Sequence, residues 1–158
     1  MLSEQYGTLW CPEYAREYLT KRGANYQYDD LLHIAQGQIV LEEEYLLRST
    51  HSTSSPFLFI DTNMHVMKVW SEYVFQQCHP FILDQIVIRN YDAYLLCKPD
   101  IPWVEDALRE YPEEKIRRQL YHYYKDLLVH QHTPWTEIGG DNQERLEKAM
   151  GFVDSLIY

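Results

Sequence analysis

The sequence predicts an α/β fold in which a parallel sheet is covered by helices on both faces. Short apolar runs that are typical of buried strands alternate along the chain with longer stretches of helical periodicity. Strands that are separated by helices are joined by crossovers, and such crossovers produce parallel strands with helices on either side. The expected architecture is therefore three-layered.

Four apolar runs are the predicted strands. The clearest is FLFID at 57–61, which is apolar on both faces, as strands of buried parallel sheets are. The others are TLWC at 8–11, YLLC at 94–97 and WTEIG at 135–139. Pro12 and Pro99 follow the first and third runs closely, and a proline ends a strand because it has no N–H for the ladder.

Helical periodicity fills the stretches between these strands. The longest pattern starts at Asp29 or Asp30, a suitable N-cap, and runs to about Arg48, with Gln38 on its apolar stripe. The polar segment 49–56 is the expected loop. A short helix is expected just after Pro102, with Trp103 in its first turn. The remaining predicted helices are 13–23, 62–78, 80–90, 113–130 and 142–157.

Length, composition and charge limit the classes of protein. A chain of 158 residues with 46% hydrophobic residues suits a single domain over 1–158. The net charge of -10 argues against a nucleic-acid binder, which would need Lys and Arg to neutralise phosphates. The three cysteines are too far apart for a metal or redox motif, and Cys11 and Cys97 are expected to be small buried strand residues. No leader or membrane span is predicted, so we expect a soluble cytoplasmic protein without nucleic-acid or membrane partners.

The residues that follow each strand are the candidate site, because ligands bind outside the carboxyl ends of the strands in such sheets. A carboxylate after an apolar strand, as at Asp61, is typical of a magnesium-nucleotide site, and the alternative is an N-cap for the next helix. Arg109 and Arg117 belong to a basic group that could close over a polyphosphate, and its alternative is a solvated face paired with neighbouring glutamates. The candidates after the four strands are Glu13, Tyr14 and Arg16; Asp61 and Thr62; Asp100, Trp103, Asp106 and Arg109; and Gly139, Gly140 and Asp141.

Several segments together resemble successive motifs of the NadR-type ribosylnicotinamide kinase domain, a P-loop kinase-like domain. The resemblance runs from about Leu2 to Ala149, and its PEYARE and PDIPWV motifs are specific. It implies ATP-dependent phosphorylation of a nucleoside hydroxyl in NAD salvage, with Mg²⁺ as the second cofactor. The matching segments are GTLWCPEYAREYL, IAQGQIVLEEE, FIDTN, VWSEYVF, YDAYLLCKPDIPWVEDALRE and IGGDNQERLEKA.

The resemblance also implies roles for individual residues. Glu13 would contact the reacting hydroxyl as a base, and Arg16 would steady the phosphate side of the site. Asp61 with Thr62 would organise magnesium. Arg109 and Arg117 would be lid arginines. The cationic pyridinium ring would stack on Tyr14, Trp70 or Trp103, and Asp106 would offset its charge. Gly139, Gly140 and Asp141 would lie at the nucleotide cofactor. For Tyr14 and Trp70, plain core packing is the alternative.

One feature of the family is not found in the printed residues. The family opens with a strand and a G-x-x-x-x-G-K-S/T loop that holds the ATP phosphates, whereas this sequence opens at MLSEQYGT, which resembles the end of the following helix. We therefore expect the first strand and the P-loop to be missing and this chain to be inactive as written. The alternatives are a non-catalytic relic that binds a nucleotide or a protein partner, and a kinase for another nucleoside. Strands without their neighbour also predict a homo-oligomer that pairs across the gap.

Overall fold

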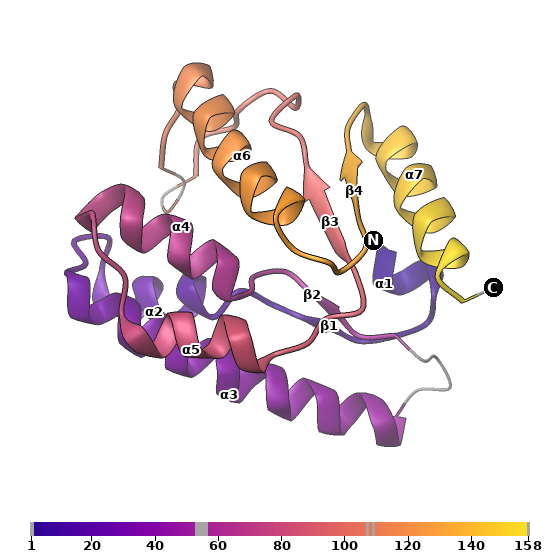
Figure 1. The fold of residues 1–158 in the computed structure, drawn as a ribbon, viewed down its shortest axis with the longest axis horizontal. Coiled ribbons are helices and arrows are strands. Elements are labelled where there is room, and N and C mark those ends of the chain that lie inside the picture. The colour runs from indigo at the N-terminus through magenta and orange to yellow at the C-terminus, as the bar shows by residue number, and fades with distance from the viewer. Residues whose placement is uncertain (1, 53–56, 107, 109, 158) are drawn as a thin grey trace. The chain divides into compact units, whose positions relative to one another are not determined.

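Helices and short parallel strands make up the described residues, which confirms the α/β class (Figure 1). This computed structural model describes residues 2–52, 57–106, 108 and 110–157. The chain divides into two compact units, Met1–Arg89 and Asn90–Tyr158, and each is described by itself. No helix within the described ranges combines the length and the apolar character that a membrane crossing requires.

The first unit is built around a pair of parallel strands. Strand β1 (Trp10–Cys11) lies beside β2 (Phe59–Ile60), with Trp10 opposite Phe59 and Cys11 opposite Ile60 (Figure 1). Hydrogen bonds extend the pairing past both ends, since Phe59 N donates to Leu9 O at 3.4 Å and Asp61 N donates to Cys11 O at 3.1 Å. The predicted strands at 8–11 and 57–61 are therefore found in parallel pairing.

Five helices accompany this pair in the described part of the first unit. The long helix α3 (Tyr28–Ser52) uses the predicted apolar stripe, because Leu31, Ile34 and Gln38 are fully or almost fully buried. The predicted loop is wrong for residues 49–52, which continue α3. Ser49 and Thr50 bond their hydroxyls to Leu46 O and Leu47 O, so these polar residues are accommodated within the helix. The helices are α1 (Leu2–Gln5), α2 (Tyr14–Arg22), α3 (Tyr28–Ser52), α4 (Met64–Phe75) and α5 (Pro80–Ile88).

The second unit also contains one parallel pair, β3 (Tyr94–Cys97) and β4 (Trp135–Ile138). The pair is in register from Tyr94 opposite Trp135 to Cys97 opposite Ile138. Helices α6 (Glu114–Val129) and α7 (Asn142–Ser155) pack beside it (Figure 1). Its core consists of Leu96, Leu128, Ile138, Ala149 and Val153.

Two expectations for the second unit are wrong. Residues 101–106 form no helix, because the prolines favour extended backbone at the residues before them and the Asp106 carboxylate accepts a hydrogen bond from Leu108 N at 3.0 Å in a local turn. Cys97 is exposed and not buried, since it is the last residue of its strand. Cys11, by contrast, is fully buried as expected.

Candidate functional site

Glu13 and Asp61 lie at the same edge of the β1–β2 pair. Asp61 directly follows β2, and Glu13 comes two residues after β1. Because the two strands are parallel and Asp61 N bonds to Cys11 O, both carboxylates follow the carboxyl ends of their strands. This is the edge at which α/β sheets bind ligands.

Neither carboxylate caps a helix. Glu13 occupies the N-cap position of α2, yet its side chain makes no capping hydrogen bond. At the next helix the cap is Asn63, whose Oδ1 accepts from His65 N at 2.9 Å and from Val66 N at 3.2 Å. The alternative, in which Asp61 caps α4, is therefore wrong, because Asn63 is the cap.

The two carboxylates share one electrostatic environment. Burial raises the pKa of Glu13 above its ordinary value, and the nearby charge of Asp61 raises it further. Removal from water likewise raises the pKa of Asp61. The Arg16 guanidinium opposes both shifts but does not cancel them. A cation at this edge would therefore be stabilised, because it would relieve the repulsion between the two carboxylates.

These residues fit a magnesium ion only in part. Carboxylate and hydroxyl oxygens are ligands that Mg²⁺ prefers, and Thr62 next to Asp61 is buried. Within the described ranges, however, no group of three or more His, Cys, Asp or Glu residues is arranged to hold a metal. Mg²⁺ here would need oxygens from water or phosphate to complete its shell, as is usual for magnesium-nucleotide sites.

Two of the expected ring-stacking residues of the first unit are already engaged in packing. Trp70 Nε1 donates to the Tyr26 hydroxyl at 2.8 Å, and the two rings meet edge to face with centroids 5.0 Å apart. The ring of Tyr14 lies directly against Gly37 of α3. For Trp70, these contacts favour the alternative of a packing residue.

The expected lid residues lie in the second unit. Arg117 donates to the carbonyl oxygens of Tyr111 and Pro112, and Arg118 pairs with Glu114 at 2.7 Å on an exposed face. Trp103 Nε1 is buried and has no hydrogen-bond partner in the part of the chain that the structure describes. Arg109 lies outside the described residues.

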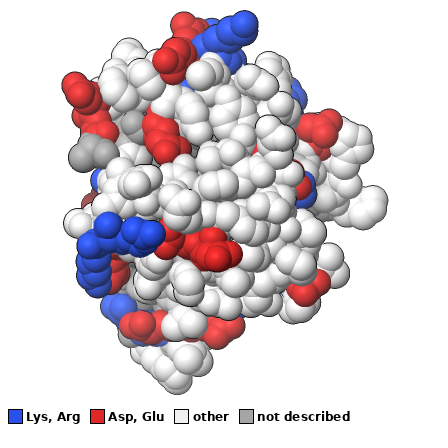
Figure 2. Space-filling view, turned by 90° about the vertical axis from the view of Figure 1, so that its left-hand side faces the viewer, with Lys and Arg blue, Asp and Glu red and all other residues white. Residues whose placement is uncertain are grey.

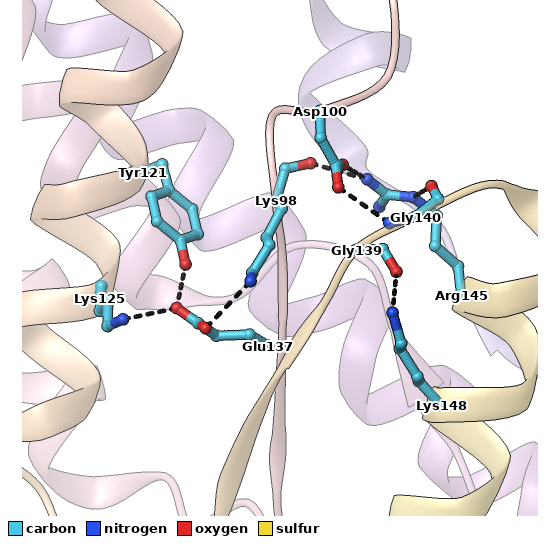
Figure 3. Close-up of polar contacts among 9 residues, drawn as sticks. All are labelled: Lys98, Asp100, Tyr121, Lys125, Glu137, Gly139, Gly140, Arg145 and Lys148. Atoms are coloured by element: carbon cyan, nitrogen blue, oxygen red, sulfur yellow. Dashed lines mark hydrogen bonds and ion pairs between the residues drawn. The ribbon is translucent and has the colours of Figure 1, made fainter.

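The loop after β4 is held by a network of polar contacts (Figure 3). The Asp100 carboxylate accepts from Gly140 N at 2.8 Å and forms an ion pair with Arg145. Lys148 Nζ donates to Gly139 O at 2.7 Å. Asp141 caps α7 in a reciprocal capping box with Glu144. The three residues expected at the nucleotide, Gly139, Gly140 and Asp141, therefore have structural contacts of their own.

A second carboxylate organises the same end of the β3–β4 pair. Glu137 accepts from Tyr121 and from Lys125, the latter at 2.7 Å, and lies 3.3 Å from Lys98 Nζ (Figure 3). The hydrogen bond from Lys125 is the largest of the effects that lower the pKa of Glu137 to about 2. Glu137, Lys98 and Lys125, together with Asp100 and the two glycines, line an open cavity of about 560 Å³.

Sequence reasoning assigned no function to Lys98, Glu137, Arg145 or Gln38. The partners of the first three come together through strand pairing and helix packing, such as Arg145 of α7 with Asp100 across 45 positions. On the face drawn in Figure 2, Lys and Arg side chains lie in small groups beside Asp and Glu, which agrees with this local pairing of charges.

A family comparison matches most of the chain. The family model described as an AAA domain covers residues 1–145. The chain belongs to this AAA domain family. Its motifs indicate a P-loop kinase-like domain of the NadR type, and solved structures agree with that fold.

Two crystal structures of NadR protein are similar to this AAA domain. One holds NAD and AMP-PNP and superposes with a TM-score of 0.70; the other holds NR and superposes with a TM-score of 0.72. Each is 18% identical in sequence, and each match covers 98% of this chain and 44% of the solved chain. The likeness shows the fold, and the chain spans less than half the length of these structures.

Proposed function

We propose that this AAA domain serves phosphoryl transfer from ATP to a nucleoside hydroxyl, with ribosylnicotinamide as the substrate, in NAD salvage. The observation that carries the proposal is the pair Glu13 and Asp61, two carboxylates at the ligand-binding edge of a parallel strand pair, neither of which caps a helix. The motif resemblance supplies the substrate class, and a NadR structure of the same fold was solved with NR.

Each residue of the pair has a defined role in this proposal. Glu13 accepts a hydrogen bond from the hydroxyl and takes up its proton, and a raised pKa brings a carboxylate closer to the range of an effective base. Arg16 orients the incoming phosphate. Asp61 and Thr62 hold Mg²⁺, which, when bound, offsets the charge that develops on phosphate oxygens.

The family resemblance supplies further residues for the proposal, which takes residues 1–158 as a single domain. Tyr14, Trp70 or Trp103 is the residue proposed to contact the pyridinium ring, and Asp106 offsets the charge of that ring. Gly139, Gly140 and Asp141 are proposed to contact the nucleotide. Arg109 and Arg117 close over its phosphates. The protein acts in the cytoplasm.

Calorimetry with ribosylnicotinamide tests the substrate-binding part. The substitution Glu13→Gln should weaken binding to residues 1–158 about tenfold, the equivalent of one hydrogen bond to a charged group. Glu17→Gln is the matched control, because Glu17 is exposed on the same helix and pairs with Lys21. Equal affinity in the two variants would contradict the assignment of Glu13. Tighter binding of another nucleoside would redirect the substrate, and no binding of any nucleoside would favour a relic with a different partner.

A turnover assay tests the catalytic part. The 158 printed residues contain no G-x-x-x-x-G-K-S/T sequence, so this polypeptide by itself should not phosphorylate ribosylnicotinamide with ATP. Fusion of a strand and phosphate loop ahead of residue 1 should produce turnover. Measurable turnover by residues 1–158 alone would show that another group replaces the loop.

A further inference from the structure

Gln38 is a fully buried amide on the apolar stripe of α3. A buried amide is stable only when its polar atoms have partners. Here Oε1 accepts a hydrogen bond from Tyr14 N at 2.7 Å, and Nε2 donates to Pro12 O at 3.3 Å and lies 3.7 Å from Cys11 Sγ. Every partner belongs to the segment 11–14 that leads from β1 into α2.

The two backbone partners of Gln38 lie on either side of Glu13. The carbonyl of Pro12 belongs to the peptide bond before Glu13, and the N–H of Tyr14 belongs to the peptide bond after it. Fixing both peptide planes fixes the backbone angles of Glu13, and these determine the direction in which its side chain leaves the chain. Asp61 N holds the same segment through Cys11 O, so the two carboxylates share one backbone support.

Gln38 also supplies a partner for the first N–H group of α2. The first N–H groups of a helix have no partner within the helix, and an N-cap side chain often accepts from one of them. Glu13 makes no such bond, and the Gln38 amide accepts from a different one of these groups, the Tyr14 N–H at the first helical position. The carboxylate of Glu13 is not used in a cap and is therefore available for a ligand.

The neighbouring glycine positions the next residue of the segment. A Cβ added to Gly37 would lie only 2.0 Å from Cε1 of Tyr14, so α3 approaches the tyrosine ring more closely than any other residue would allow. Gly37 and Gln38 are adjacent on α3 and act on adjacent residues, Tyr14 and Glu13. These contacts give a structural role to Gly37 and Gln38 within the motif IAQGQIV.

We infer that Gln38 is a positioning residue that aims the Glu13 carboxylate at the ligand-binding edge beside Asp61, with Gly37 seating Tyr14 next to it. The inference extends the proposed function and rests on it only for the identity of the ligand. The contacts of residues 11–14 with α3 are independent of that identity.

The test compares Gln38→Met with Gln36→Met in residues 1–158. Methionine matches the glutamine in size and removes the hydrogen bonds, and Gln36 is an exposed residue of the same helix two positions earlier. In Q38M, the pKa of the Glu13 carboxyl, followed by carbon-13 NMR, should fall towards its ordinary value as the segment loosens and admits water. Affinity for ribosylnicotinamide should fall about tenfold. Neither quantity should change in Q36M.

A conservative variant separates positioning from general stability. In Gln38→Glu, burial favours the protonated form of the introduced carboxyl, which can accept from Tyr14 N and donate to Pro12 O as the amide does. In Q38E the affinity for ribosylnicotinamide should therefore stay near that of the wild type while the introduced carboxyl is protonated. An ionised carboxylate cannot donate to Pro12 O and adds a like charge, so its ionisation should raise the pKa of Glu13 further. If Q38M does not fold, Q38E still tests the role, because a folded Q38E that loses affinity while its carboxyl is protonated would contradict it.

Different results overturn the two proposals. A folded Q38M whose Glu13 titration and ribosylnicotinamide affinity equal those of the wild type overturns the positioning role. A wild type that does not bind ribosylnicotinamide, together with a shifted Glu13 titration in Q38M, overturns the proposed substrate and supports the positioning role.

Discussion

At the scale of single residues, the candidate site consists of two carboxylates, Glu13 and Asp61, at one edge of the β1–β2 pair. Both also feel the charge of Arg16. Burial is the largest cause of the raised pKa of Glu13, and the charge of Asp61 is the second. These two causes can be separated by mutation, because replacing Asp61 removes its charge and leaves Glu13 in place.

The substitution Asp61→Asn should lower the pKa of Glu13 part of the way to its ordinary value. The shift should be partial, because removing the like charge leaves the burial of Glu13 unchanged. Carbon-13 NMR of the glutamate carboxyl groups measures it. Asp84→Asn, at an exposed position on α5, is the control and should leave Glu13 unaffected. An identical titration of Glu13 in the wild type and in D61N would mean that the two groups do not interact.

At the scale of elements, one aspartate joins the end of α2 to the start of α3. The Asp30 carboxylate accepts from Arg22 Nε, Tyr18 Oη and Gln27 N, each at 2.7 Å. The hydrogen bond from Arg22 is the main reason that the pKa of Asp30 falls to about 2. Ionised Asp30 therefore stabilises the junction between the two helices.

The substitution Asp30→Asn should lower the free energy of unfolding by about 1 kcal/mol at neutral pH, where charge-assisted hydrogen bonds are lost. A lowered folded-state pKa stabilises the protein above the ordinary pKa of 3.8, and this contribution disappears as the pH falls from about 4 to about 2. The difference between wild type and D30N should therefore close over that range. Urea unfolding at a series of pH values measures it.

Asp29→Asn is the matched control for this experiment, since the Asp29 side chain is 85% exposed and lies 3.7 Å from His79 Nε2, beyond hydrogen-bond distance. It should change stability little at any pH. If D30N and D29N had the same effect, the junction would not depend on the carboxylate of Asp30.

At the scale of the whole molecule, the described strands form two separate parallel pairs. Each described strand thus has hydrogen-bonded neighbours on one side only, and unpaired strand edges favour association with other chains. The net charge of -10 opposes such association through repulsion between copies.

Purified residues 1–158 should therefore form an oligomer whose population rises with ionic strength, because salt screens the repulsion between copies. Size-exclusion chromatography with light scattering at low and high salt measures it. A stable monomer at every salt and protein concentration would show that the strand edges are covered within the chain.

The sequence by itself determined the order of the elements and the edge at which the candidate site lies. Strand and helix periods are local properties, so 8–11, 57–61, 94–97 and 135–139 could be predicted as strands from their own residues. Once the strands are parallel, the residues after them must meet at one edge of a pair, and Glu13 and Asp61 follow from that rule alone.

Only the tertiary structure decided which polar side chains have structural partners. Gln38 looked like one more member of an apolar stripe, and its role depends on residues 24 to 27 positions away, whose distance is set by the packing of α2 on α3. Asp100 and Asp141 resembled free rim carboxylates in the sequence, yet register and local capping supply each with donors. Periodicity predicts which face a residue occupies, whereas hydrogen-bond partners depend on distances between segments that are remote in the chain.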